Sequence, residues 1–145
     1  MYKRILLKLS GEQLQGDLQG GFDTERARWI SKEVIKTLET GAQIVIMVGG
    51  GNYARGAQLA SSSIQRVTAD NIGMLATLMN ALALADVFNS QGVPTRALSN
   101  IKADQLVDQF THRRATSHLA KGRVVIVAGA GGAGASAAMP LRKSS

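Results

Sequence analysis

The chain has 145 residues, of which 45% are hydrophobic and 19% charged, and its formal net charge is +7. That apolar content excludes an intrinsically disordered chain, and the length suffices for one domain with a buried core. The absence of cysteine excludes disulfide frameworks, thiol nucleophiles and cysteine-based zinc sites. The basic residues are scattered and the aromatic residues are few, so nucleic-acid binding is not favoured.

The hydropathy pattern gives no sign of a membrane protein. No stretch of 18 apolar residues predicts a membrane span, and Lys8 interrupts the first apolar run too early for a secretory signal peptide. We therefore expect a cytoplasmic protein that does not contact a membrane.

The first third of the chain predicts two strands joined by a helix. Residues 5–9 and 44–48 are short apolar runs, each stopped by small residues, and are typical of buried strands. A loop rich in Gly and Gln is expected over residues 12–21. Asp23 or Thr24 can then cap a helix, whose apolar positions recur at helical spacing, and Gly41 follows its end.

The remainder continues the alternation of helices and strands. We expect a long helix from Thr68 to about Gly92, a strand at residues 93–98, one or two helices within residues 102–118, and a strand at residues 124–127. Strands that are apolar on both faces and alternate with amphipathic helices indicate a mainly parallel sheet covered by helices. Residues 129–145 are almost entirely small residues with a basic end. They predict a disordered tail after a domain at residues 1–128.

Two loops follow predicted strands at the edge where parallel sheets bind ligands. In the first, Lys8 can direct its ammonium into the crevice, while Ser10 and Gly11 can offer backbone N–H groups to phosphate oxygens. The alternative is a solvated lysine at a strand end.

The second loop is residues 49–52, three glycines followed by an asparagine. The glycines permit close approach of the backbone to a ligand, and Asn52 can cap a following helical turn. Arg55 lies within reach of the same anion. The alternative is a flexible turn.

The remaining motifs indicate a function less strongly. Asp70, expected in the first turn of the long helix, either complements the helix dipole or accepts hydrogen bonds from sugar hydroxyls. Residues 129–134 match the glycine pattern of dinucleotide-binding loops, but no helix and no acidic residue follow at the required distance. His112 and His118 have no neighbouring ligand set, so no metal site is predicted.

Three stretches together resemble the UMP kinase family within the amino acid kinase fold. They are residues 2–12, residues 48–52 with Arg55 and Gly56, and residues 70–84. The resemblance implies a three-layer α/β/α sandwich, phosphoryl transfer from ATP with Mg²⁺ to UMP in pyrimidine nucleotide (CTP) biosynthesis, and a homo-hexamer. It also ties residues 16–22 to activation by GTP in some members.

The resemblance also implies individual roles. Lys8 would be catalytic, contacting the ATP phosphates and stabilising the transferring group. The rest of the ATP-phosphate site would comprise Leu9, Ser10, Gly11, Gly51 and Arg55. Gly50 would contact UMP, and Asp70 would bind the UMP ribose.

The resemblance stops near Ala128. The family's acceptor-binding loop and the half that binds the ATP base do not follow in this sequence, so we expect a frameshifted or truncated product that is inactive on its own. The alternatives are another amino acid kinase, which phosphorylates an acid, or a non-catalytic fragment that still oligomerises.

Overall fold

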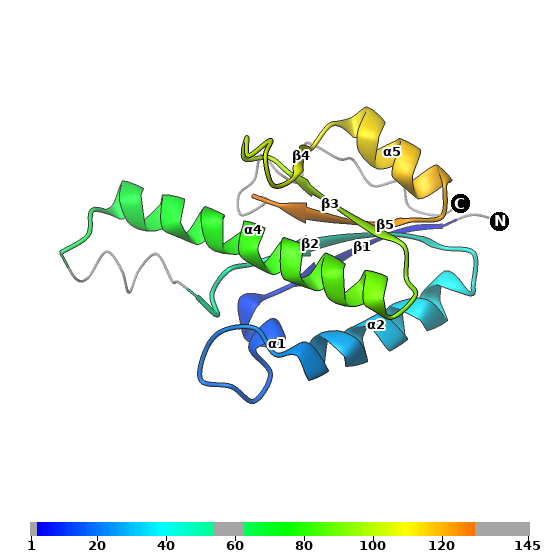
Figure 1. Cartoon of the computed structure of the whole chain (residues 1–145), viewed down its shortest axis with the longest axis horizontal. Helices are drawn as coiled ribbons and strands as arrows, with labels where there is room; N and C mark the ends of the chain where they lie inside the picture. The colour runs from blue at the N-terminus through cyan, green and yellow to red at the C-terminus, as the bar shows by residue number, and fades with distance from the viewer. Residues whose placement is uncertain (1–2, 54–62, 130–145) are drawn as a thin grey trace.

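The computed structural model describes residues 3–53 and 63–129, which form one parallel sheet with helices on both faces (Figure 1). The strands are β1 (Arg4–Leu9), β2 (Gln43–Val48), β3 (Thr95–Ser99), β4 (Asp108–Gln109) and β5 (Val124–Ala128). The helices are α1 (Gly11–Gln15), α2 (Thr24–Leu38), α4 (Arg66–Ser90) and α5 (His112–Ala120). The sheet order is β1-β2-β5-β3-β4, and every neighbouring pair is parallel.

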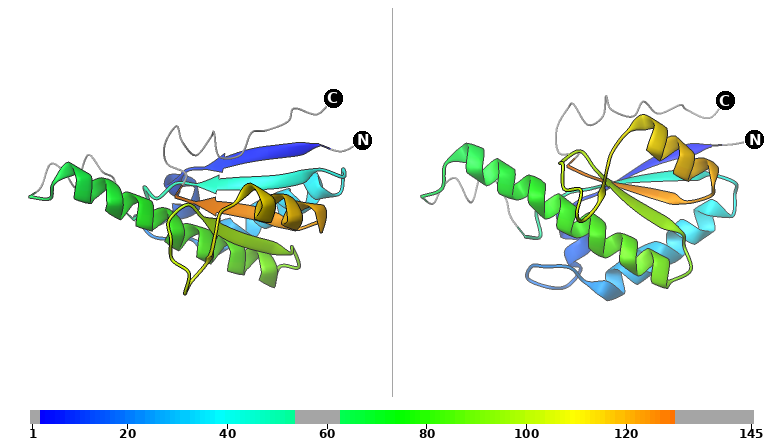
Figure 2. Two further views of the ribbon diagram at one scale, coloured as in Figure 1. Left: turned by 90° about the horizontal axis from the view of Figure 1, so that it is seen from above. Right: turned by 45° about the horizontal axis from the view of Figure 1, so that its top comes forward.

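The sheet and the helices on its two faces make three layers, as predicted. Helices α2 and α4 cover one face of the sheet, and α5 covers the other (Figures 1 and 2). Alternate residues of the central strands serve the two cores because successive side chains of a strand point to opposite faces. Ile46 and Ile126 are buried on the α2 and α4 side, whereas Val45 and Val125 are buried on the α5 side.

Local sequence determines where α2 begins and where its connection to β2 turns. The Asp23 carboxylate caps the helix by accepting hydrogen bonds from the backbone N–H groups of Glu25 and Arg26, at 3.0 and 3.4 Å. Gly41, at φ +87°, occupies the left-handed region that glycine adopts at low cost. The predicted helix and its glycine terminator are therefore confirmed.

Three predicted boundaries are wrong. The long helix begins at Arg66, not Thr68, and the Gly/Gln-rich loop contains the short helix α1. Residues 102–118 hold only the helix that starts at His112. Before it, Asp108 and Gln109 pair with the end of β3, and the N–H of Phe110 donates to the carbonyl of Ser99 at 2.6 Å. The sheet takes these backbone groups, so a helix cannot form there.

Helix α4 has the length and apolar character that a membrane span needs: its best 18-residue window has a mean hydropathy of 1.4. Half of that window is buried inside the fold, however, and Leu84 and Phe88 are fully buried against the sheet. This pattern is typical of the core helix of a globular domain. The first turns of α4 extend past the carboxyl ends of the strands (Figures 1 and 2).

Candidate functional site

The two predicted glycine loops meet at the carboxyl edge of the sheet. A Cβ placed on Gly11 would lie 2.4 Å from the backbone nitrogen of Gly51 and 2.5 Å from that of Asn52. A Cβ on Gly49 would lie 3.2 Å from the nitrogen of Gly11. No residue larger than glycine fits at Gly11 without moving one loop away from the other. The structure thus brings together the loops after β1 and β2.

Gly50 is needed for a different contact, with helix α4. A Cβ on Gly50 would lie 2.7 Å from the Cβ of Ala76 and 2.8 Å from the carbonyl oxygen of Gly73. The absence of a side chain lets the loop after β2 rest directly on the helix. Gly50 therefore fixes the separation between this loop and α4.

Asn52 and Asn80 lock the same loop to α4. The Asn52 Nδ2 donates to Asn80 Oδ1 at 3.0 Å and to the carbonyl of Gly21 at 2.8 Å. The Asn80 Nδ2 donates to Asn52 Oδ1 and to the carbonyl of Gly49, both at 2.7 Å. The helical turn that Asn52 was predicted to cap lies outside the described residues. Sequence reasoning missed Asn80, whose only signal was a polar side chain on an apolar helix.

A third strand end is tied to α4 through Thr77. Its Oγ1 accepts a hydrogen bond from the N–H of Gly129, the residue that follows β5, at 2.7 Å. The same hydroxyl donates to the carbonyl of Met74 at 2.6 Å. One helix therefore contacts the loops that leave β2 and β5.

Ser10 has a structural role that departs from its predicted one. Its Oγ accepts from the N–H of Gln13 at 3.2 Å, and its own N–H donates to Gln13 Oε1 at 2.7 Å. This reciprocal pair is a capping box for α1. In this structure the Ser10 N–H is engaged by Gln13. The Ser-x-x-Gln spacing at residues 10–13 was the signal, and it was overlooked.

Other backbone donors remain at the edge. Within residues 3–53 and 63–129, no backbone carbonyl accepts a hydrogen bond from the N–H of Gly51 or of Asn52. Successive N–H groups of this kind form anion-binding concavities. The carboxylate of Glu12 lies beside Gly51, since a Cβ there would be 2.8 Å from its Oε1.

Lys8 and Leu9 end strand β1 differently. Leu9 is buried in the core on the α4 side, and its carbonyl accepts the N–H of Gly49 at 2.8 Å, so it supports the loop. Lys8 is exposed and follows Leu6 by two residues, so it lies on the opposite, α5 side of the sheet. Its ammonium is free to reach a ligand beyond the strand end.

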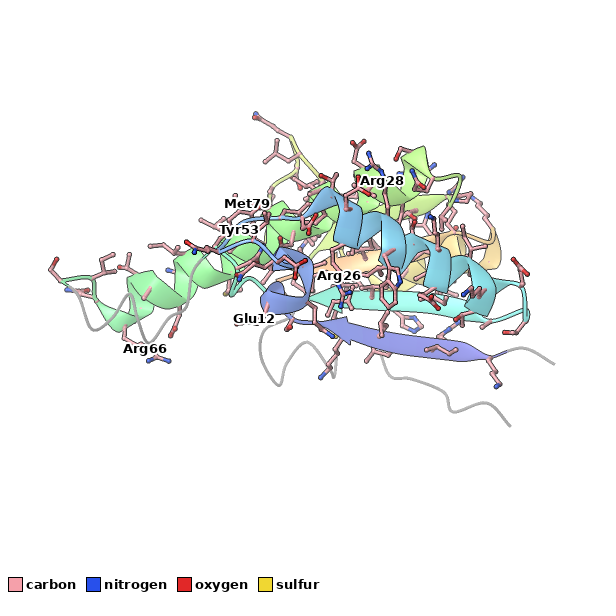
Figure 3. The ribbon with its side chains drawn as sticks, turned by 90° about the horizontal axis from the view of Figure 1, so that it is seen from below. Glu12, Arg26, Arg28, Tyr53, Arg66 and Met79 are labelled. Atoms are coloured by element: carbon pink, nitrogen blue, oxygen red, sulfur yellow. The ribbon has the colours of Figure 1, made fainter. Side chains whose placement is uncertain are left out.

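Asp70 lies on the part of α4 that extends past the sheet. Because the helix begins at Arg66, Asp70 falls in its second turn, so the first-turn prediction is wrong. Its Oδ1 pairs with Arg66 Nε at 3.2 Å, and both side chains are more than half exposed. Figure 3 shows Arg66 on the projecting end of α4, and Glu12 on α1, just beyond the end of β1. Arg55 lies outside the described residues.

Asp70 shares one face of α4 with the residues that hold the loops. Gly73, Thr77 and Asn80 follow it by three, seven and ten residues, which is the spacing of one helix face. A rise of about 1.5 Å per residue places Asp70 about 10 Å along the axis from Thr77. The site therefore consists of three strand ends and one helix face that continues beyond them.

The described residues contain no group of three or more histidine, aspartate or glutamate side chains placed to hold a metal.

A parallel sheet whose strand ends carry abutting glycine loops, crossed by a single helix, places the chain among the α/β proteins that bind a ligand at the carboxyl edge of the sheet. The model of the amino acid kinase family matches residues 3–142, and the chain belongs to this family. The fold class predicted from the sequence is confirmed.

Curated relatives resemble the chain over most of its length. It is 46% identical over 128 residues to the uridylate kinase of Methylococcus capsulatus, covering 88% of this chain and 54% of the relative. It is 49% identical over 127 residues to the uridylate kinase of Dichelobacter nodosus, covering 88% and 53%. The predicted resemblance is confirmed, and the chain spans about half the length of the curated relatives it matches.

Solved structures agree. The crystal structure of UMP kinase from Bacillus anthracis superposes with a TM-score of 0.82 at 35% identity, covering 89% of this chain and 53% of that one. Aspartate kinase from Synechocystis has a TM-score of 0.58 at 17% identity, covering 87% and 21%, and shows the fold alone.

Proposed function

We propose that this chain forms the UMP-binding half of a UMP kinase, which transfers the γ-phosphoryl group of ATP to UMP and releases UDP and ADP. The observation that carries the proposal is the meeting of the two glycine loops on helix α4, within a chain whose relatives named uridylate kinase are 46% and 49% identical.

The reaction makes particular demands on these residues. A phosphate oxygen of UMP attacks the γ-phosphorus of ATP while the bond to the ADP oxygen breaks, and charge spreads over the transferring group. Lys8 neutralises that charge from the end of β1. The backbone N–H of Gly51 and the guanidinium of Arg55 hold the phosphates. ATP enters as its Mg²⁺ complex. Catalysis then rests on positioning and charge rather than on a covalent intermediate.

The acceptor nucleotide uses the other side of the site. The backbone at Gly50 contacts UMP. Asp70 accepts hydrogen bonds from the two ribose hydroxyls. On this proposal, the enzyme works in pyrimidine nucleotide synthesis in the cytoplasm, assembles as a hexamer and responds to GTP through the loop at residues 16–22.

We propose that the 145-residue chain binds UMP without turning it over, because the described residues supply the acceptor side of the site. The test combines calorimetric titration with UMP and a coupled assay for ADP release with UMP, ATP and Mg²⁺. Binding without UMP-dependent turnover supports the proposal. Turnover of the chain alone would show that the site is more complete than proposed.

Two alternatives give different results in the same experiments. An amino acid kinase of another specificity would bind a carboxylic acid, such as aspartate or glutamate, in preference to UMP. A non-catalytic fragment would bind neither nucleotide nor acid but would still associate, which light scattering detects.

A further inference from the structure

Asn80 is a fully buried amide in the apolar helix α4. Burying an unpaired amide is costly, so its partners decide whether it is tolerated. Both of its Nδ2 hydrogens are used, toward the Gly49 carbonyl and Asn52 Oδ1, and its Oδ1 accepts from Asn52. A leucine or alanine would fit an apolar helix better. The amide is therefore matched to the loop after β2.

Thr77 has a similar place one turn earlier. It is 5% exposed, and its hydroxyl holds the N–H of Gly129. Together, Asn80 and Thr77 give α4 polar contacts with the loops after β2 and β5, on the helix face that also carries Asp70.

We infer that Asn80 and Thr77 are positioning residues for the acceptor nucleotide. They touch no nucleotide themselves. Because a helix is stiff over a few turns, they fix the loops after β2 and β5 at a set distance from Asp70. This inference rests on the proposed function, since UMP must span from the glycine loop to Asp70 for the distance to matter.

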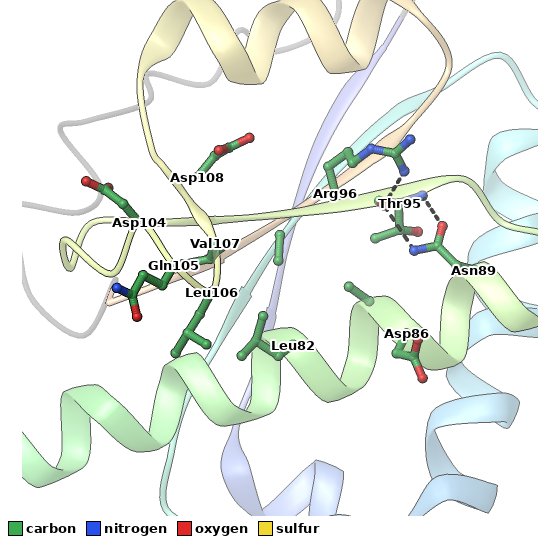
Figure 4. A pocket seen from close by; sticks show the side chains of 12 residues that line it. Leu82, Asp86, Asn89, Thr95, Arg96, Asp104, Gln105, Leu106, Val107 and Asp108 are labelled. Carbon is green, nitrogen blue, oxygen red and sulfur yellow. Dashed lines mark hydrogen bonds between the residues drawn. The ribbon is translucent and has the colours of Figure 1, made fainter.

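The experiment uses the 145-residue chain and the variant Asn80→Ala, with Asn89→Ala as its matched control. Asn89 is on the same helix and also bonds backbone, accepting from the N–H of Thr95 at 2.8 Å and donating to its carbonyl at 3.2 Å. It lies at the other end of α4, beside a cavity of about 480 Å³ between the helix, β3 and residues 104–108 (Figure 4). Leu119→Ala, on the buried face of α5, controls for lost stability.

Two measurements are made on each variant: amide hydrogen exchange and UMP affinity by titration. In Asn80→Ala, we expect the amides of Gly49 and Tyr53 to exchange about tenfold faster than in either control, because both hydrogen bonds belong to the loop that Asn80 holds. UMP affinity should fall about tenfold, the effect of one net hydrogen bond. The double variant Asn52→Ala/Asn80→Ala should lose little more UMP affinity than Asn80→Ala alone, because the two side chains act as one pair.

Equal exchange in Asn80→Ala and the controls would overturn the inference. So would faster exchange with unchanged UMP affinity, because the loop would then move without consequence for the nucleotide. If the unmodified chain does not bind UMP, the proposed function fails and the nucleotide part of the inference falls with it. Exchange alone would then show whether Asn80 holds the loop.

If Asn80→Ala does not fold, two variants of Thr77 provide a second test. Thr77→Val keeps the shape and removes the acceptor for Gly129, whereas Thr77→Ser keeps the acceptor. Faster exchange at Gly129 and weaker UMP binding in the valine variant, restored in the serine variant, support the inference. Identical behaviour of the two variants contradicts it.

Discussion

Asn52 and Asn80 bind each other reciprocally through their side-chain amides, at 3.0 and 2.7 Å, and so join the glycine loop after β2 to the middle of helix α4. Asn52 is 6% exposed and Asn80 is fully buried, so neither amide can turn to water if the other is removed.

We expect Asn52→Ala to lower the free energy of unfolding by about 1–3 kcal/mol, the cost of leaving buried polar groups unsatisfied. The variant strands an Asn80 donor and the carbonyl of Gly21, which Asn52 now serves. Urea unfolding followed by circular dichroism measures the change. A loss below about 0.5 kcal/mol, the size of an ordinary surface substitution, would contradict it.

Gly50→Ala tests the close approach of the loop to α4. The new methyl group meets Ala76 and the Gly73 carbonyl at distances that require movement, so we expect a loss of about 1–3 kcal/mol in stability and weaker UMP binding.

The matched control for this prediction is Gly73→Ala. A Cβ at Gly73 meets no atom within 4 Å, and it lies inside a helix, where alanine is favoured over glycine by up to about 1 kcal/mol. Thermal unfolding should therefore separate the two variants in opposite directions. Equal destabilisation by both would mean that α4, rather than its contact with Gly50, is sensitive.

Lys8→Ala is predicted to affect turnover far more than UMP affinity. The measurement needs a longer protein, in which the C-terminal half of the Methylococcus capsulatus relative follows residue 128. Loss of a charge that acts mainly in the transition state lowers kcat about 10²-fold or more. Lys3→Ala, just before the first residue of β1, should leave kcat unchanged. A raised KM with normal kcat would make Lys8 a binding residue instead.

Asp70→Asn should weaken UMP binding and leave the KM for ATP nearly unchanged in the same longer protein. A carboxylate can accept from both ribose hydroxyls, whereas an amide offers one oxygen acceptor, so the cost is about 1.5–3 kcal/mol. Loss of the exposed pair with Arg66 contributes little to stability. Asp86→Asn, also exposed on α4, is the control. Unchanged UMP affinity in Asp70→Asn would mean that the only role of Asp70 is its ion pair with Arg66 on α4.

His118 makes stability depend on pH. Burial, with the charges of Arg123, Arg96 and Lys121, lowers the pKa of His118 below its ordinary value of 6.5, although Asp108 offsets part of the effect. The Arg123 guanidinium donates to His118 Nδ1 at 3.1 Å, which requires that nitrogen to be unprotonated. As the pH falls, the unfolded chain binds the proton first. The contribution of neutral His118 to the free energy of unfolding is therefore complete above pH 6.5. It is lost as the pH drops through the lowered pKa of His118.

Melting temperatures measured from pH 8 to pH 5 test this prediction. The decrease toward low pH should be smaller in His118→Gln than in the unmodified chain, while His112→Gln, at the exposed start of α5, should behave as the unmodified chain does. The same decrease in all three proteins would assign the pH dependence to other groups.

Sequence reasoning found the features whose causes are local. Apolar runs ended by small residues identified β1, β2 and β5, because a strand buried on both faces needs such a run. Asp23 and Gly41 marked the limits of the segment containing α2 through capping and backbone conformation, which depend on a few adjacent residues. The glycine loops could be placed at one edge because all strands of a parallel sheet end there.

The tertiary structure alone decided what those loops touch. Asn80 meets Asn52 across 28 positions of sequence, and Thr77 meets Gly129 across 52. No periodicity records such a pairing. Strand β4 formed against a helical expectation because the free edge of β3 offered its backbone partners. The physical reason is common to these cases: a buried polar group is stabilised by whichever partner the folded chain brings within about 3 Å, and only the packing of distant segments determines that partner.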